Sequence, residues 1–449
     1  MKNTTRHVIG IAIIILMVLV SWAIIDTLGT ERYNNLGIEE YQKGNYDKAI
    51  EYFTEAIELN PNNAIAYHNR GLGYLKTGSK YTPEGRASLE KAISDYSKAV
   101  ELKPDYVEAY YHRGIARIEF IHFYDSPFGQ AENELFKEAL NDFNRALDLD
   151  ETFYLSYSGM GNAYDRYGKF DEAVKWYNKA LENEEKILQK RGKEALAAIY
   201  YSRGRAYQRV EDPQAIQDYE KSLEYDPNLG TTLGHLAGIY SIIGKYDDAL
   251  ELYDRSVKIK ESMPALGLYD FHTWEGRGKC YYKLGEYEKA IQDLNRAKEV
   301  ARRPLPEAHL YLGKIFSITG DEVKATEHFD NAVKICSQNI EKIEKGEDVW
   351  LYPTQVYALY NLRGLVYLEL REYDKAISDF ERVVQLSPKN FPRGHTYYPV
   401  EGRKNIGIAY SKMGDKEKAK EFYQEALSIV EERGLHFTKN EIEGLPKEL

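Results

Sequence analysis

Five arginines stand directly before a glycine, at a position where the surrounding helical pattern calls for an apolar side chain. They are Arg70, Arg113, Arg203, Arg277 and Arg363. A guanidinium can hold a carboxylate or a phosphate through two parallel hydrogen bonds. Because the same placement recurs along the chain, it predicts either a row of ligand contacts or a repeated structural contact.

Other residues that could do chemistry do not form a recognisable site. The stretch GYLKTGSK resembles a phosphate loop, but Ser79 and Lys80 stand in the wrong order and no strand precedes them. The ten histidines are dispersed without metal-ligand spacing, and His328 is interpreted as a packing residue. Cys280 and Cys336 are isolated and are interpreted as small apolar side chains. We therefore expect no catalytic residues, no cofactor and no metal.

Composition narrows the class of partner. The chain has 449 residues and a net charge of -11, and 29% of its residues are charged. Phosphate backbones are bound by basic stripes, so this acidic balance argues against nucleic acid as a partner. The length exceeds that of one ordinary core and favours several domains or a repeat array.

The N-terminus differs from the rest of the chain. Residues 8–25 form an apolar run just long enough to cross a bilayer, with Lys2 and Arg6 before it and Asp26 after it. This pattern predicts a transmembrane anchor within residues 1–30, with its N-terminus in the cytoplasm and the remaining chain outside. The alternative is a cleaved signal peptide with Ser21 and Ala23 at the cleavage site, which predicts a secreted or periplasmic protein.

A repeated unit occupies residues 31–433, and its first copy shows the pattern. Two helical halves are separated by Gly44, and Pro61 ends the second half. The small residues Gly37 and Ala49 allow the two helices to approach, and Phe53 fills the space between them. The spacing returns ten times. Later first-helix small residues are Gly71, Gly114, Gly161, Gly204, Ala237, Gly278, Gly313, Gly364 and Gly407, and the matching second-helix residues are Ala92, Ala139, Ala173, Ala215, Ala249, Ala290, Ala325, Ala376 and Ala419.

This spacing resembles the tetratricopeptide repeat family over almost the whole chain. The resemblance implies an all-α, right-handed superhelical solenoid of about ten helix-turn-helix repeats, added here to one N-terminal transmembrane helix. It also implies a binding scaffold rather than an enzyme. Residues 434–449 are expected to cap the last repeat. Insertions lengthen the second and third repeats. Near the insertion of the third repeat, Phe120, Phe123, Tyr124 and Phe128 could form a contact patch or pack back on neighbouring helices.

A comparison of the repeats gives the arginines a partner. Three residues past the second-helix alanine, the five repeats with arginine have Asp95, Asp142, Asp218, Asp293 and Asp379. The other five have an apolar residue in place of the arginine and none has aspartate, and no repeat mixes the two kinds. We therefore predict structural pairs between Arg70 and Asp95, Arg113 and Asp142, Arg203 and Asp218, Arg277 and Asp293, and Arg363 and Asp379. The alternative is that the arginines line a ligand groove.

In the tetratricopeptide repeat family the first helices line a concave surface, so the resemblance implies where a partner would bind. The positions that follow each first-helix small residue, with Tyr201 beside them, are the expected contacts. They are Asn162, Arg166, Tyr201, Arg205, Arg209, Lys279, Tyr282, Lys283 and Lys314. A basic stretch within an acidic protein favours a protein or peptide partner with an acidic segment or a C-terminal carboxylate. The alternative is a solvated groove without a specific partner.

These observations predict a membrane-tethered protein-interaction scaffold that binds its partner in the concave groove, outside the cytoplasm. Two alternatives stay open. The chain could be a recruiting or regulatory subunit of a separate membrane enzyme or secretion complex. It could also face the cytoplasm as an adaptor.

Overall fold

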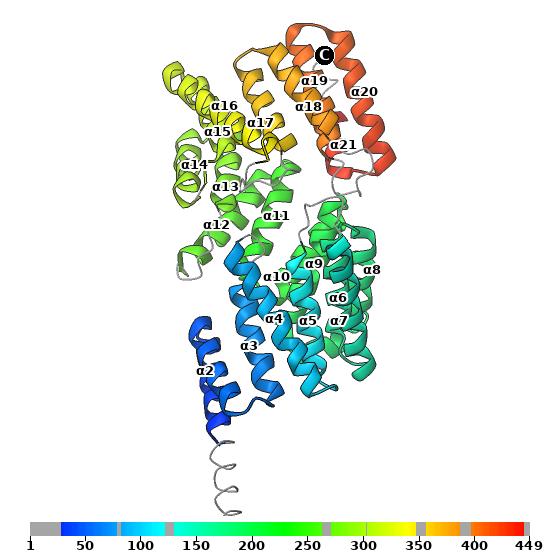
Figure 1. Ribbon diagram of the computed structural model, residues 1–449. Coiled ribbons are helices and arrows are strands. Elements are labelled where there is room, and N and C mark those ends of the chain that lie inside the picture. The colour runs from blue at the N-terminus through cyan, green and yellow to red at the C-terminus, as the bar shows by residue number, and fades with distance from the viewer. Residues whose placement is uncertain are drawn as a thin grey trace, which may run out of the picture. The chain divides into compact units, whose positions relative to one another are not determined.

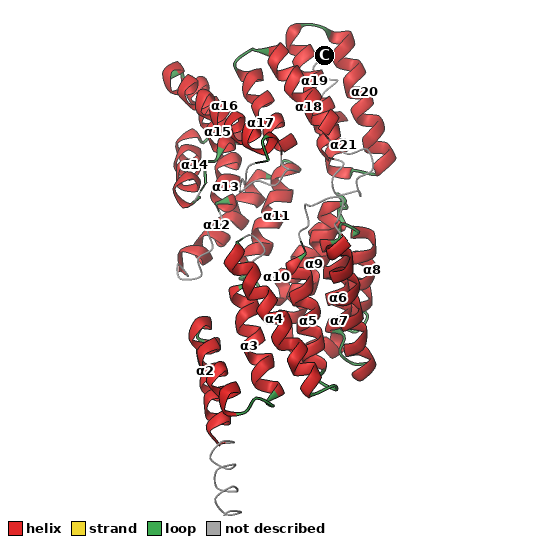
Figure 2. Ribbon diagram, viewed as in Figure 1, coloured by secondary structure: helices red, strands yellow, loops and turns green. Residues whose placement is uncertain are grey.

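The computed structural model describes residues 28–78, 82–121, 130–262, 271–301, 303–346, 356–386 and 397–443. Within these ranges all regular secondary structure is helical and no strand occurs (Figure 2). The predicted all-α repeat architecture is confirmed for this part of the chain, and the handedness of the solenoid stays a prediction. No helix among the described residues is long and apolar enough to cross a membrane. The predicted anchor at residues 8–25 lies outside the described residues.

The chain divides into an N-terminal unit, Met1–Tyr167, and a C-terminal unit, Gly168–Leu449. In the N-terminal unit residues 28–42 are helical. The helices that follow are α2 (Tyr46–Leu59), α3 (Ala64–Thr77), α4 (Pro83–Leu102), α5 (Val107–Phe120), α6 (Gln130–Leu149) and α7 (Leu155–Arg166) (Figure 1).

The C-terminal unit holds the remaining helices. They are α8 (Phe170–Leu181), α9 (Glu184–Arg209), α10 (Gln214–Tyr225), α11 (Gly230–Ile242), α12 (Tyr246–Ser262), α13 (His272–Lys283), α14 (Tyr287–Val300), α15 (Pro306–Thr319), α16 (Glu322–Glu344), α17 (Val356–Glu369), α18 (Tyr373–Leu386), α19 (Tyr397–Met413), α20 (Lys416–Arg433) and α21 (His436–Glu443). Helix α9 is broken at Gly192, whose φ of 83° separates an extension of the fourth repeat from the first helix of the fifth.

In seven repeats of the described ranges, a glycine on the first helix faces an aromatic ring on the second. In the ninth repeat a Cβ added at Gly364 would lie 2.6 Å from the ring of Phe380, which is fully buried. Only a residue without a side chain permits this approach, so the ring fills the space between α17 and α18. The predicted role of the small first-helix residues thus follows from close packing.

In eight of the ten repeats, the turn between the two helices has a left-handed backbone conformation seven residues after the first-helix small residue. In the second and third repeats, which carry insertions, Gly78 and Ile121 have a φ of -69° at this position. Glycine occupies this position with a positive φ at Gly44, Gly168, Gly244, Gly285, Gly320 and Gly414. The fifth and ninth repeats have Glu211 (φ 53°) and Arg371 (φ 61°) instead. A side chain in this conformation costs about 1 kcal/mol relative to glycine, so these two exceptions need a reason.

The insertions extend second helices. Helix α4 begins at Pro83 and is 20 residues long, with the Thr82 side chain accepting a hydrogen bond from the Gly85 N–H. Helix α16 extends to 23 residues. Of the predicted contact patch, Phe120 ends α5 and is half-buried, with the Arg86 guanidinium 4.5 Å from its ring. Phe123, Tyr124 and Phe128 lie outside the described residues.

The C-terminal segment packs on the last repeat. Leu435 and Ile442 are buried in one apolar cluster with Val430 of α20 and Val400 of α19. The end of the last repeat is therefore covered by α21, and the exact domain boundary at residue 434 stays a prediction.

Candidate functional site

The structure brings the five arginines to the five aspartates. In the ninth repeat Nε and Nη2 of Arg363 donate to the two carboxylate oxygens of Asp379 at 2.8 and 2.7 Å. Two-nitrogen contacts of the same kind join Arg70 to Asp95, Arg113 to Asp142, Arg203 to Asp218 and Arg277 to Asp293. Each guanidinium thus holds the second helix of its own repeat against the first.

These pairs are largely removed from water. The side chain of Asp379 is 7% exposed and that of Arg363 is 17% exposed. Burial raises the pKa of Asp379 although the guanidinium opposes this shift. Conversely, the hydrogen bond to Asp379 raises the pKa of Arg363, so the arginine stays charged. Without its partner the carboxylate would carry an uncompensated desolvation cost.

The third nitrogen of each arginine reaches the preceding repeat. Nη1 of Arg363 donates to Oγ of Ser337 on α16 at 2.9 Å. The equivalent acceptors are Thr54 for Arg70, Ser97 for Arg113, Asn178 for Arg203 and Asp254 for Arg277. The arginine therefore joins two repeats as well as two helices, which the sequence comparison did not predict.

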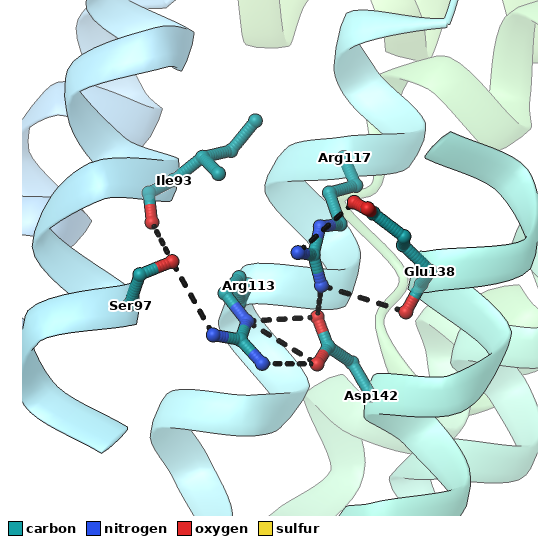
Figure 3. A network of polar contacts seen from close by, with 6 residues as sticks. All are labelled: Ile93, Ser97, Arg113, Arg117, Glu138 and Asp142. Carbon is teal, nitrogen blue, oxygen red and sulfur yellow. Dashed lines mark hydrogen bonds and ion pairs between the residues drawn. The ribbon is translucent and has the colours of Figure 1, made fainter. Parts of the chain in front are cut away.

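Asp142 in the third repeat receives two guanidinium groups (Figure 3). Arg113 contacts both of its carboxylate oxygens, and Arg117 donates to one of them from the next turn of α5. Arg117 also forms an ion pair with Glu138 at 3.0 Å, while Arg113 donates to Ser97 of the preceding repeat. Asp142 is 1% exposed, so this network is part of the packing between repeats rather than an open site.

A tyrosine accompanies most of these arginines. In four repeats a tyrosine stands three residues before the arginine, and its ring centroid lies 5.2–5.6 Å from the guanidinium carbon. The four rings are Tyr67, Tyr110, Tyr200 and Tyr360. A cation over an aromatic face is stabilised electrostatically, which gives one reason for the frequent tyrosines of this chain.

A second contact between repeats recurs on neighbouring first helices. One partner stands three residues before the small residue of its first helix. The other stands two residues before the small residue of the next first helix, and the two side chains form a hydrogen bond. The four examples are Asn34 with Asn69 (2.9 Å), His68 with His112 (3.0 Å), Tyr201 with His235 (3.3 Å) and Asn361 with Asn405 (2.8 Å). Tyr201, predicted to contact a partner, is thus also part of this set of contacts between repeats.

Three of the predicted partner-binding cations are already in ion pairs between first helices. Arg166 contacts Glu119 at 2.9 Å. Lys279 lies 2.5 Å from Glu307, and Lys314 lies 3.0 Å from Glu369. Although burial opposes it, the Glu307 carboxylate raises the pKa of Lys279. These cations contribute less net positive charge to the surface than their sequence positions imply.

Arg209 on α9 and Lys283 on α13 are different. Both side chains are exposed, and neither forms an ion pair with a residue of the described ranges. The Arg205 guanidinium lies 5.9 Å from the ring of Tyr201, and the ring of Tyr282 packs edge-on against Tyr311 at 5.3 Å. Asn162 and Arg166 belong to the N-terminal unit, whereas the other predicted contacts belong to the C-terminal unit.

Helix α11 lies between α9 and α13 in the order of first helices. It has Gly238 at the position of Arg205 and Lys279, Gly234 at the position of Tyr201, and the exposed Ile242 at the position of Arg209 and Lys283. A Cβ added at Gly238 would meet no atom closer than 3.9 Å, and one at Gly234 none closer than 4.0 Å. Close packing therefore does not require glycine there, in contrast to Gly364. Both residues are partly exposed, so a partner's backbone could approach α11 closely.

Other reactive side chains form no site in the described ranges. No group of three potential metal ligands occurs among those residues. His328 was expected to pack in the core, but it is only half-buried and its Nδ1 lies 2.9 Å from Nδ1 of His309. Cys280 and Cys336 are buried free thiols, and burial raises the pKa of Cys336 to about 12.

Comparisons with known proteins agree with the geometry. Family models described as tetratricopeptide repeat match residues 31–63, 154–186, 229–263, 273–303 and 355–432, and one described as TPR repeat matches residues 88–118. BBSome complex member BBS4 of Bos taurus is 27% identical over 178 residues, which cover 40% of this chain and 29% of that protein. A TPR repeat-containing protein of Methanocaldococcus jannaschii is 21% identical over 446 residues, covering 90% of this chain and 70% of that one.

Among solved structures, yeast Tom70 matches 93% of this chain and 95% of its own with 16% identity and a TM-score of 0.40. Members of the matched family generally act as protein-interaction scaffolds. The family models, the recurring glycine-to-ring packing and the left-handed turns lead to one conclusion: the chain belongs to the tetratricopeptide repeat family.

Proposed function

We propose that this chain is a membrane-tethered scaffold whose C-terminal unit binds an acidic peptide or protein segment along α9, α11 and α13. The observation that carries the proposal is the contrast among the inner-face cations. Arg209 and Lys283 are exposed and have no ion-pair partner in the described ranges, whereas Lys279 and Lys314 are neutralised by glutamates. Exposed cations without carboxylate partners attract an acidic ligand most strongly.

The glycines of α11 support the same location. Gly234 and Gly238 leave space at the helix between the two cations without being required by packing. A peptide backbone can approach such a surface and can accept hydrogen bonds from neighbouring side chains. The tyrosines on either side, Tyr201 and Tyr282, would supply amphipathic contact area.

A selection from a random peptide library tests the binding site. The selected peptides should be enriched in Asp and Glu. Their affinity should fall when the salt concentration is raised from about 50 to about 300 mM, because exposed charges become screened over this range. Arg209→Glu and Lys283→Glu should each weaken binding about tenfold. Lys258→Glu, an exposed charge change on the second helix α12, is the matched control and should leave binding unchanged.

Two outcomes would remove the proposal. Selected peptides without acidic enrichment would contradict the charge argument. Equal affinity of the Arg209→Glu, Lys283→Glu and wild-type proteins would place the site elsewhere. A photo-crosslinking probe at Tyr201 or Lys283 in cells then identifies the natural partner by mass spectrometry.

The tether and its orientation are part of the proposal and are supported by the apolar run at residues 8–25 with Lys2 and Arg6 before it. Deleting residues 1–27 should release the protein from the membrane fraction. In intact cells the repeats should be digested by added protease once any outer permeability barrier is opened. Protection of the repeats under those conditions would contradict the orientation.

A further inference from the structure

The C-terminal helix α21 contacts the fifth repeat as well as the last. The backbone N–H of Thr438 donates to one carboxylate oxygen of Glu211 at 3.0 Å, and its hydroxyl donates to the other at 2.7 Å. The two residues are 227 positions apart, and Thr438 is 3% exposed. Both belong to the C-terminal unit, so this contact joins the beginning of that unit to its end (Figure 1).

The contact satisfies an unmet requirement of α21. Thr438 is the third residue of this eight-residue helix, and the first four N–H groups of a helix have no acceptor within the helix. Glu211 supplies a carboxylate at the positive end of the helix, as a capping side chain normally does from the same segment. Here the cap comes from a distant turn, so α21 contacts two repeats: Ile442 and the preceding Leu435 pack on the last repeat, and Thr438 binds the fifth.

The turn that contains Glu211 lacks the glycine that most repeats have at this position. Six repeats have glycine at this left-handed position, whereas Glu211 adopts a φ of 53° with a side chain attached. Glycine at this turn would offer Thr438 no side-chain acceptor, whereas the Glu211 carboxylate accepts from both its N–H and its hydroxyl, which offsets the strain. Arg371, the other exception, occupies the same turn of the ninth repeat and provides a natural comparison.

We propose that α21 is a latch that closes the C-terminal unit between its fifth and tenth repeats, and that a partner gains full access to the α9 end of the binding surface when α21 leaves Glu211. Arg209 lies two residues before Glu211 and is exposed with α21 in place, so the latch would restrict a partner that extends past Arg209 toward the turn rather than the cation itself. The consequence for access rests on the function proposed above, but the latch itself does not.

Hydrogen exchange of the full-length, ligand-free protein tests the latch. Glu211→Gly removes the carboxylate and also relieves the turn, so the variant should fold at least as well as the wild type. Its α21 amides should exchange about tenfold faster. Thr438→Val, which removes the hydroxyl donor but keeps the N–H, should give a smaller increase. Arg371→Gly makes the same backbone change and should leave the exchange of α21 unaltered.

Unchanged exchange of α21 in both Glu211→Gly and Thr438→Val would overturn the latch. So would equal acceleration by Arg371→Gly, because the effect would then come from the turn alone. With a selected acidic peptide, Thr438→Val, which weakens the latch without changing any charge, should bind several-fold more tightly than the wild type. If faster exchange is observed without tighter binding, α21 is held by Glu211 but does not control access, and the regulatory part fails. If no acidic peptide is selected, the proposed function fails. The hydrogen-exchange result still decides whether the latch exists.

Discussion

Nη1 of Arg363 donates a hydrogen bond to Oγ of Ser337 at 2.9 Å, and the two residues belong to different repeats. The same guanidinium holds Asp379 within its own repeat. One side chain therefore stabilises both the pairing of helices and the stacking of repeats. The predictions that follow depend on this double role and on the contacts that accompany it.

Replacing Arg363 with leucine should lower the free energy of unfolding by about 3 kcal/mol, because it leaves the carboxylate of Asp379 buried without a partner. Adding Asp379→Phe should recover most of this loss, since the tenth repeat has Ile406 and Phe422 at the equivalent positions. Urea unfolding of the two single variants and the double variant measures the coupling. Strictly additive losses would contradict direct pairing.

The charge-reversed pair Arg277→Asp with Asp293→Arg should fail to recover stability, although the wild-type residues are in direct contact. The reason is Asp254, which accepts a hydrogen bond from Nη1 of Arg277 at 2.8 Å and would face the new aspartate. The equivalent swap of Arg363 and Asp379 faces the neutral Ser337 and should recover more. Thermal unfolding of both double variants provides the comparison, and equal recovery would show that the neighbouring repeat's acceptor has no influence.

Stability of the N-terminal unit should fall as the pH drops below about 6.5. Burial lowers the pKa of His68 to about 4, so between these pH values the unfolded chain binds a proton that the folded chain does not. The effect is absent above pH 6.5 and reaches about 3 kcal/mol below pH 4. His68→Gln should flatten the urea-unfolding profile across this window, whereas His272→Gln at an exposed position should not. A steep profile retained in His68→Gln would assign the effect to another group.

Two glycines on first helices should respond oppositely to alanine. Gly364→Ala places a methyl group 2.6 Å from Phe380 and should cost about 1–3 kcal/mol through overpacking. Gly238→Ala meets nothing within 3.9 Å and should be neutral or stabilising by up to about 1 kcal/mol, since alanine favours helix. Differential scanning calorimetry distinguishes the two, and similar losses at both sites would contradict the open space at α11.

Glu307→Gln should strengthen binding of the selected acidic peptide without touching a contact cation. The change removes the nearer of the two carboxylates that pair with Lys279, leaving Glu275 at 3.8 Å, and increases the positive charge of the surface. We expect a gain of about threefold at low salt that shrinks at high salt, measured by fluorescence anisotropy. Unchanged binding would place Lys279 outside the site.

The repeat pattern predicted the fold and the arginine-aspartate pairs because each residue keeps its place relative to the small residue of its own helix. The separation of the two partners itself varies from 15 to 29 residues. The ion pairs of Arg166 with Glu119 and of Lys314 with Glu369 were not predicted, since the two pairs join different positions of their repeats and so give no recurring combination. The contact between Thr438 and Glu211 also lies outside the period. It had one signal in the sequence, namely the glutamate at a turn position that is usually glycine, but nothing in the sequence indicated which distant residue it would bind.

The hydrogen bond from the arginine to the preceding repeat also limits how such a chain can be rearranged. A repeat with the arginine needs a hydroxyl, amide or carboxylate on the second helix before it, as Thr54, Ser97, Asn178, Asp254 and Ser337 provide. Each repeat with the arginine therefore restricts which repeat can precede it. A shortened or recombined array would have to be assembled by matching neighbours, not by counting copies.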